Sequence, residues 1–443
     1  MSFRFIRRSR RFRAHSEHWQ RRAIFVLGGI AVGAAAVALA VLADLVQQAF
    51  RNLLAAWPWA AFAVTPLGFG ASVYATNRFF RNSQGSGIPQ VIAARQLSDA
   101  TARERLVSLR IAIGKILLTL LGLLCGASAG REGPTVQVGA SIMSVVGRFS
   151  PRRQPGLLLA GAAAGVAAAF NTPLAGIVFA IEEMSRSFEQ RTSGLVIGCV
   201  IAAGLASLVV LGNYTYFGTT AATLNSAADW IAVPVCGVLG GAMGGLFSRI
   251  LVGFAHGWPG AVGRRLKRHP VLFAMACGLV VAACGTLSGN SVYGTGYMQV
   301  RGLLDGTQPL PQDFGILKFA ATILSSISGI PGGIFSPSLA VGAGLGFNIA
   351  HLLPHSPQGA IILLGMVAYF AGVVQAPITA FVIVTEMTNN NAMLVPLMTA
   401  ALIAHGTSRL ISREGVYHAL SKNFLHEAEK VAPAATGAGG PPS

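Results

Sequence analysis

The chain has 443 residues, of which 53% are hydrophobic and only 11% charged, and its formal net charge is +18. Soluble globular domains carry about 25% charged residues, so this composition excludes an ordinary soluble protein. It predicts an all-α polytopic membrane protein instead.

The positive charge is concentrated at the two ends of the chain and in one loop. Residues 1–22 and 263–270 are rich in Arg and Lys, and so is the segment 409–430. Basic segments beside membrane helices tend to remain in the cytoplasm and to attract anionic lipid. We therefore expect both termini in the cytoplasm, with membrane lipid and not nucleic acid as the partner. RNA binding by the tail is the weaker alternative.

The first apolar stretch, 23–50, predicts the first membrane helix, because it is too long for the core of a signal peptide and no cleavage site is apparent. A bilayer span needs roughly 20 residues. Apolar stretches long enough for a span lie at 23–50, 52–76, 156–182, 194–213, 228–253, 270–288, 358–384 and 393–411.

Shorter apolar segments between the spans are interrupted by Gly, Pro or polar residues. They lie at 111–129, 134–147, 316–328 and 338–352. Non-helical backbone is tolerated at membrane depth only where protein or a water-filled cavity covers it. The pattern predicts broken helices arranged around a site.

The chain contains an internal repeat, which is its most informative feature. Lys, Thr, Gly, Pro and Ala residues of 115–140 recur at an offset of 203 in 318–343, and Gly161, Pro173 and Glu182 recur at an offset of 204. A repeat with interrupted segments predicts a transporter or channel whose site lies between two halves. The repeat alone leaves the relative orientation of the halves open.

The repeat also suggests how the chain is divided. We expect a basic cytoplasmic tail at 1–22, a first membrane repeat at 23–211 and a polar linker at 212–229. A second membrane repeat at 230–418 would include the start of a final helix. Residues 419–443 predict a disordered cytoplasmic tail, because the segment is polar and ends in Ala, Gly and Pro.

In both halves a Gly-rich turn leads into a proline and an apolar run, which predicts helix starts at Pro134 and Pro337. The segment 85–89 is a third candidate, where Ser86 adds a hydroxyl. The segment 294–296 is a weaker match to it at the corresponding place in the second half. Helix N-termini bind anions through free N–H groups and a partial positive charge. Such ends around one centre favour a small desolvated anion over a cation.

The segment 130–134, which leads into Pro134, places Arg131 and Glu132 at membrane depth. An ionisable residue at the bilayer centre costs about 3 kcal/mol on insertion scales, so such residues are usually paired or line an aqueous path. We expect Arg131 to orient its loop and Glu132 to line the aqueous path and act in it.

The motifs GSGIP (85–89), GREGPTVQVG (130–139) and GGIFSPSLAVGA (332–343), followed by Tyr417, resemble in this order the CLC family of chloride channels and proton/chloride exchangers. The segment 160–184 is also similar to the family's pattern. The resemblance implies a CLC-type fold of two inverted-topology repeats with tilted and broken helices. It also implies that the protein is of the bacterial type and forms a homodimer in the inner membrane.

Carried over position by position, the resemblance implies that chloride is bound by the hydroxyls of Ser86 and Tyr417 and by the backbone amides of Ile334 and Phe335. Glu132 would be the external gate and proton acceptor. The implied selectivity filter consists of Gly85, Ser86, Gly87, Ile88, Pro89, Gly130, Arg131, Glu132, Gly133, Pro134, Gly333, Ile334, Phe335, Ser336 and Pro337.

Glu183 matches the family's internal proton-transfer glutamate, which favours a secondary active antiporter that exchanges chloride for protons. A purely structural interpretation, capping or pairing at a helix end, is the alternative for Glu183 and the preferred one for Glu182. For Lys115, Lys318 and Glu386 we expect a structural role, pairing across the bundle.

Other functions are compatible with parts of this pattern. A passive voltage- or pH-gated chloride channel on the same fold is the main alternative. A sodium-coupled carrier fits the broken helices alone. We expect no enzyme, since no H-E-x-x-H or G-x-S-x-G motif occurs.

No cofactor or metal is expected, because the five cysteines lie in apolar stretches without C-x-x-C spacing and are predicted to be free thiols. Ser86 and Tyr417 favour chloride over nitrate and fluoride by comparison with other branches of the family. The tail lacks room for the family's nucleotide-binding modules, so we expect no nucleotide.

Overall fold

The computed structural model describes residues 2–185, 190–212, 214–257, 266, 268–307 and 310–431. Within them the backbone is mostly helical, and β-pairing is limited to two isolated bridges. Six of the described helical segments are long and apolar enough to cross a bilayer. They are Trp19–Ala56, Ala100–Leu124, Gly194–Leu211, Ala227–His256, Pro270–Leu287 and Asn391–Ile411.

The first half of the chain contains the following helices: α1 (Ser2–Ala56), η1 (Pro58–Ala60), α2 (Ala61–Phe79), α3 (Ile88–Gln96), α4 (Ala100–Glu104), α5 (Leu109–Leu124), α6 (Glu132–Gly147), η2 (Pro151–Arg153), α7 (Gln154–Phe170), α8 (Pro173–Phe179), η3 (Ala180–Ser185) and α9 (Gln190–Leu211).

The second half contains η4 (Ala227–Ile231), α10 (Ala232–His256), α12 (Pro270–Leu287), α13 (Tyr297–Leu304), α14 (Phe314–Ile327), α15 (Phe335–Leu352), α16 (Gln358–Val374), α17 (Pro377–Thr388), η5 (Asn391–Met393), α18 (Leu394–Ile411) and α19 (Val416–Val431).

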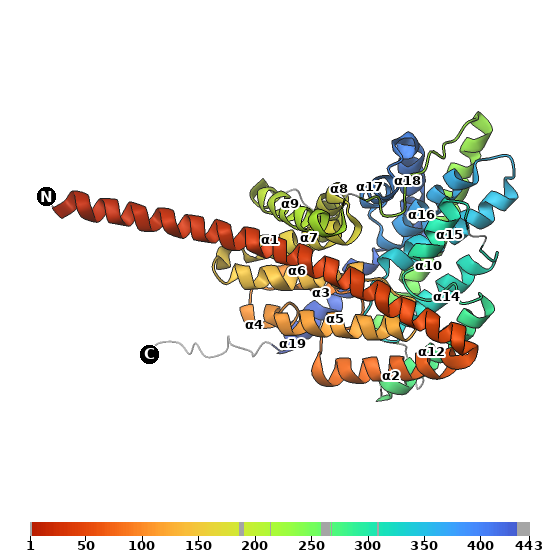
Figure 1. The fold of residues 1–443 in the computed structure, drawn as a ribbon, viewed down its shortest axis with the longest axis horizontal. Coiled ribbons are helices and arrows are strands. Elements are labelled where there is room, and N and C mark those ends of the chain that lie inside the picture. The colour runs from red at the N-terminus through yellow and green to blue at the C-terminus, as the bar shows by residue number, and fades with distance from the viewer. Residues whose placement is uncertain are drawn as a thin grey trace, which may run out of the picture.

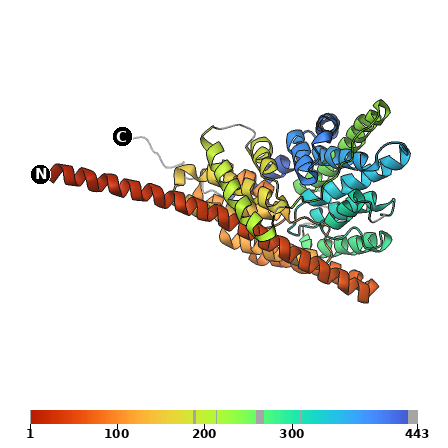
Figure 2. The ribbon, with the colours of Figure 1, turned by 45° about the horizontal axis from the view of Figure 1, so that its top comes forward.

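The helix order repeats between the halves. Shifts of 203 and 204 residues take α5 to α9 onto α14 to α18, and corresponding helices have corresponding neighbours. Thus α6 packs on α7 as α15 packs on α16, and α1 packs on α9 as α10 packs on α18. The halves lie side by side in both views, and the N-terminal end of α1 projects from the body (Figures 1 and 2).

At the centre of each half lies a helix rich in small and apolar residues, α7 or α16, which is buried along nearly its whole length. It packs directly on the preceding helix, with Gly139 facing Gly161 in one half and Gly342 facing Gly365 in the other. A Cβ atom on Gly342 would lie only 2.6 Å from the Gly365 carbonyl oxygen. Glycine at these positions lets the two helix backbones touch.

Two of the predicted single spans, 156–182 and 358–384, are each divided into two helices, so the prediction of unbroken spans was wrong. The breaks fall at Asn171 and Gln375, which end α7 and α16 with φ of 56° and 60°. In both cases a proline two positions later begins the next helix, since proline has no N–H to continue the preceding one.

The predicted span 52–76 is also interrupted, because α1 continues to Ala56 and α2 begins only at Ala61. Trp57 is extended, as expected for a residue that precedes a proline. At its other end, α1 passes without a break through the boundary drawn at residue 22.

The disordered tail predicted at 419–443 is wrong for residues up to 431, which belong to α19. This helix packs on α3 and α10, and the side chains of Leu420 and Phe424 contact the core. Their spacing of four residues places them on one face of a helix, a signal hidden by the polar residues around them. Residues 432–443, and half of the basic loop at 263–270, lie outside the described residues.

Two glutamates join the halves by capping each other's helices. Glu386 of α17 accepts hydrogen bonds from the backbone N–H groups of Leu174 (3.2 Å) and Ala175 (2.8 Å) at the start of α8. Glu182, its equivalent in the first half, accepts from Ile378 (3.0 Å) and Thr379 (2.6 Å) at the start of α17. The structural roles expected for both glutamates are confirmed, and the capping is reciprocal.

Replacing Glu386 by Ala removes both acceptors at the start of α8. Hydrogen bonds to a charged group contribute about 1.5–3 kcal/mol, so we expect a lower apparent Tm in detergent, followed by intrinsic fluorescence. Glu104→Ala is the control, because Glu104 pairs with Arg148 at the surface (2.9 Å) and exposed pairs contribute about 0–1 kcal/mol. Equal effects of the two substitutions would contradict the capping role.

Candidate anion-binding site

The three Gly-rich motifs meet at one place in the structure. Gly130 and Gly333 exchange two backbone hydrogen bonds, of 2.6 and 2.7 Å between N and O. Gly85 N donates to Ile330 O (3.2 Å), and Gly332 N donates to Gly85 O (3.0 Å). These bonds are the two isolated bridges of the fold, and they join motifs from both halves.

A helix begins at each motif: α3 after Gly87, α6 at Glu132 and α15 at Phe335. None of these three described helix starts has a side-chain cap, so their first N–H groups are available to a ligand. Gly87 has φ of 98°, a conformation that only glycine adopts readily. All residues of the predicted filter are buried except Gly85, which is half-buried.

The Glu132 side chain is completely buried and reaches from the start of α6 to the start of α15. Its Oε1 atom accepts a hydrogen bond of 2.7 Å from the Ser336 hydroxyl. Its Oε2 atom has no hydrogen-bond partner among the described residues. The carboxylate therefore occupies a position suited to an anion, and it is held there incompletely.

The neighbouring Arg131 points away from this centre, toward α1. Its guanidinium donates to the Ala40 carbonyl oxygen (2.5 Å) and forms an ion pair with Asp44 (2.8 Å). The arginine thus orients the loop, as expected from the sequence.

Two buried lysines hold the loops that precede the helix starts. Lys115 Nζ donates to the carbonyl oxygens of Ser83 and Gly85, both at 2.7 Å. Lys318 Nζ donates to the Gly294 carbonyl oxygen at 2.8 Å, so the segment 294–296 occupies the position in the second half that 85–89 occupies in the first. The expected structural role is confirmed, but each lysine binds its own half and does not pair across the bundle.

A cavity of about 310 Å³ adjoins two of the three motifs, 85–89 and 332–343, and is lined by Ser86, Ile334 and Tyr417, among others. The hydroxyls of Ser86 and Tyr417 are buried and have no hydrogen-bond partner among the described residues. Buried hydroxyls are normally satisfied, so two unsatisfied ones in a cavity indicate a ligand that accepts hydrogen bonds. Phe335 is packed against Phe370, with ring centroids 4.2 Å apart, which fixes the start of α15.

Glu183 lies away from the three motifs, in the π-helical turn η3, and only 2% of its surface is exposed. His418 of α19 donates from Nε2 to the Glu183 backbone carbonyl (2.7 Å) and lies 3.9 Å from its carboxylate. A hollow of about 410 Å³ opens beside it, lined by Arg95, His418 and Lys422, among others. Glu183 therefore has surroundings different from those of its neighbour Glu182, which caps α17.

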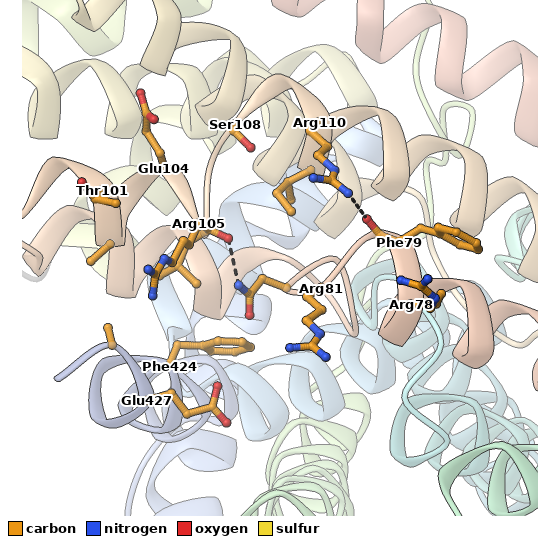
Figure 3. Close-up of a pocket in the computed structure, with 15 residues that line it drawn as sticks. Arg78, Phe79, Arg81, Thr101, Glu104, Arg105, Ser108, Arg110, Phe424 and Glu427 are labelled. Atoms are coloured by element: carbon orange, nitrogen blue, oxygen red, sulfur yellow. Dashed lines mark hydrogen bonds between the residues drawn. The ribbon is translucent and has the colours of Figure 1, made fainter. Parts of the chain in front are cut away.

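An arginine-rich hollow of about 710 Å³ lies between α2, α4, α5 and α19 (Figure 3). Four arginines line it, namely Arg78, Arg81, Arg105 and Arg110. It shares Phe424 and Glu427 with the cavity of Ser86 and Tyr417, so the two spaces adjoin. Positive charge beside the mouth of a site raises the local concentration of anions.

Sequence reasoning missed two residues near this region: His418, which contacts Glu183, and Tyr216, whose ring packs on Phe170 beside Phe335. His418 follows Tyr417 directly and carries no motif of its own. Tyr216 lies in the polar linker, where two tyrosines and a phenylalanine within four residues were the available signal. Among the described residues, no cluster of His, Cys, Asp and Glu could hold a metal ion.

This arrangement, with uncapped helix N-termini and buried hydroxyls in a multi-pass membrane protein, defines an anion-transporting class. The profile of the family described as voltage gated chloride channel matches residues 67–409. The chain therefore belongs to this family.

Similar curated proteins include the H(+)/Cl(-) exchange transporter ClcA of Yersinia pseudotuberculosis, 32% identical over 91% of this chain and 87% of the relative. ClcA of Cronobacter sakazakii is 30% identical over 85% and 84% of the two chains. Among solved structures, a slow cyanobacterial Cl-/H+ antiporter has a TM-score of 0.77 at 24% identity and covers 91% of this chain and 98% of its own. A CLC-type fluoride/proton antiporter has a TM-score of 0.76 at 21% identity over 90% and 96%. These likenesses confirm the predicted fold class.

Gly133→Ala tests how tightly the motifs are packed. A Cβ atom there would collide with the Ser86 hydroxyl and lie 3.2 Å from Gly333 Cα. Overpacking costs about 1–3 kcal/mol, so we expect a lower apparent Tm. Gly204→Ala in α9 is the control, because no atom lies within 4 Å of its Cβ and alanine favours a helix. A Gly133→Ala protein as stable as the control would show that the motifs are loosely packed.

Proposed function

We propose that the protein is a secondary active antiporter that exchanges chloride for protons across the membrane. The observation that carries the proposal is the buried Glu132 carboxylate, which lies between the uncapped N-termini of α6 and α15 and bonds to Ser336. The curated relatives named as H(+)/Cl(-) exchange transporters support it.

Chloride binds in the cavity beside the motifs 85–89 and 332–343. The hydroxyls of Ser86 and Tyr417 donate to it, and the backbone amides of Ile334 and Phe335, at the start of α15, complete the site. The buried hydroxyls lack other partners, so binding an anion satisfies them. The other filter residues hold these groups in position through the bonds of Gly85, Gly130 and Gly333.

Glu132 is the external gate and proton acceptor. In its charged form the carboxylate stays at the start of α15, where it excludes chloride from the same helix ends. Protonation removes the negative charge and with it the attraction to the positive helix end. The side chain then leaves, chloride enters, and the proton moves with the glutamate.

Glu183 is the internal proton-transfer residue. It is buried and lies at the edge of the hollow lined by Arg95, His418 and Lys422, which gives protons access from the opposite side. Chloride and protons thus share the outer part of the path and separate further in. The arginine-rich hollow would supply chloride to the inner mouth.

Membership of the family supports the remaining proposals, which concern the membrane, the assembly and the partners. We place the protein in a bacterial inner membrane as a homodimer, with both termini in the cytoplasm and lipid around it. The partners are chloride and protons, and neither nucleic acid nor a nucleotide is involved.

Glu132→Gln imitates the protonated gate. We expect chloride flux in liposomes to continue while proton movement falls to background, because the amide neither binds a proton nor competes as an anion. Chloride release measured with a silver/silver chloride electrode and external pH measured together test this. Persistent proton movement would remove Glu132 from its role.

Glu183→Val should also abolish proton movement while chloride flux continues, since the variant closes the internal proton entry and leaves the chloride site intact. Glu104→Gln serves as a surface carboxylate control and should behave as the wild type. Unchanged coupling in Glu183→Val would leave Glu183 with a structural role only.

The decisive experiment uses the wild-type protein in liposomes with a chloride gradient. If chloride efflux drives protons uphill while an ionophore clamps the voltage, the protein is an exchanger. If protons follow only the voltage, it is a passive channel and the proposal fails.

A further inference from the structure

A second arginine-lined hollow, of about 760 Å³, lies in the first half, where α1 packs on α6, α7 and α9 (Figures 1 and 2). This α1–α9 hollow shares no lining residue with the cavity of Ser86 and Tyr417 or with the hollow of Figure 3. Its basic residues are Arg21, Arg22, Arg152 and Arg153. Its apolar residues are Ile24, Phe25, Val146, Phe149, Leu157 and Leu195.

The α1–α9 hollow lies where two helices that can cross a bilayer begin. Arg21 and Arg22 lie in the first turn of the span Trp19–Ala56. Leu195 lies in the first turn of the span Gly194–Leu211, which packs beside it. At the end of a span, basic residues meet the phosphates of the lipid headgroups, while apolar side chains still meet the acyl chains. The hollow thus offers both kinds of surface at the depth where a phospholipid presents both.

Close helix packing holds the walls of the α1–α9 hollow in place. A Cβ atom on Gly28 of α1 would lie 2.7 Å from Val146 Cγ2 of α6. A Cβ atom on Gly198 of α9 would lie 3.2 Å from Phe25 Cε1 of α1. Small residues at such positions let helices approach closely. The packed helices therefore form the hollow themselves, as is usual for ligand sites.

The positive charge of the α1–α9 hollow is not compensated by acidic residues. All four arginines are exposed, and none of them takes part in the ion pairs of the described residues. No acidic side chain among the described residues lines it, whereas Glu104 and Glu427 line the hollow of Figure 3. Guanidinium groups bind phosphate through paired N–H donors. Four of them in one hollow therefore favour an anionic phosphate group.

We propose that the α1–α9 hollow binds an anionic phospholipid, with its phosphate among the arginines and an acyl chain along the apolar side chains. A free phosphate would use the arginines alone, whereas the lipid uses both parts of the hollow. The bound lipid joins the start of α1 to the turn η2 between α6 and α7, and so stabilises their packing. The inference does not depend on the proposed exchange of chloride for protons.

The test measures lipid binding to the purified full-length protein in detergent by native mass spectrometry. Dioleoyl phosphatidylglycerol is the anionic probe and dioleoyl phosphatidylcholine the neutral one, and we expect the wild type to retain the anionic lipid preferentially. Arg152→Gln with Arg153→Gln removes two of the four charges. The affinity for phosphatidylglycerol should then fall about 25-fold, because each basic residue near the headgroups contributes about fivefold. Arg21→Gln with Arg22→Gln, on α1, should cause a similar loss.

The matched control is Arg409→Gln with Arg413→Gln, which removes the same charge at the end of the span Asn391–Ile411. Both arginines are exposed, and they line neither arginine-rich hollow. The control should bind phosphatidylglycerol as the wild type does.

A loss confined to the two variants of the α1–α9 hollow supports the inference. Equal retention of the two lipids by the wild type overturns it without any variant. Equal losses in the control and the hollow variants also overturn it, because they indicate a diffuse attraction between basic residues and lipid. Inorganic phosphate is the third probe. If it displaces phosphatidylglycerol at the same concentration, the arginines bind phosphate alone and the lipid assignment fails, whereas no displacement supports the lipid.

Discussion

Two backbone hydrogen bonds between Gly130 and Gly333 determine the geometry of the whole site. They satisfy polar groups that would otherwise be costly at membrane depth, and so allow irregular backbone there. They also set the starts of α6 and α15 beside each other. A carboxylate on the first residue of one helix, Glu132, therefore reaches a hydroxyl in the first turn of the other, Ser336.

The buried charges differ in how completely their surroundings satisfy them. Lys115 and Lys318 are bound by backbone carbonyls, and Glu182 and Glu386 by backbone N–H groups at helix ends. These charges stabilise one arrangement. Glu132 has one carboxylate oxygen that accepts from the Ser336 hydroxyl and one without a hydrogen-bond partner among the described residues. The difference separates the four structural charges from the one to which the proposed function assigns a gating movement.

Composition predicted the all-α membrane class, and the repeat with its Gly and Pro residues predicted that the motifs meet, whereas the inverted arrangement of the halves came only from the resemblance. It did not predict the breaks at Asn171 and Gln375, since neither is a glycine and apolar residues continue on both sides. Tyr216 was missed for a different reason: its burial depends on rings from two distant parts of the chain, Phe170 and Tyr297. The local sequence therefore indicated the backbone conformation of the site, but it did not indicate the contacts between residues that lie far apart in the chain.

The reciprocal caps have a consequence for how such a chain can fold. Each half carries the carboxylate that caps a helix of the other, so each half reaches its full stability only beside its partner half. Expressed as two separate polypeptides, the halves would each carry an uncapped helix and an unsatisfied glutamate until they met. Their association and their final folding would then be a single cooperative event.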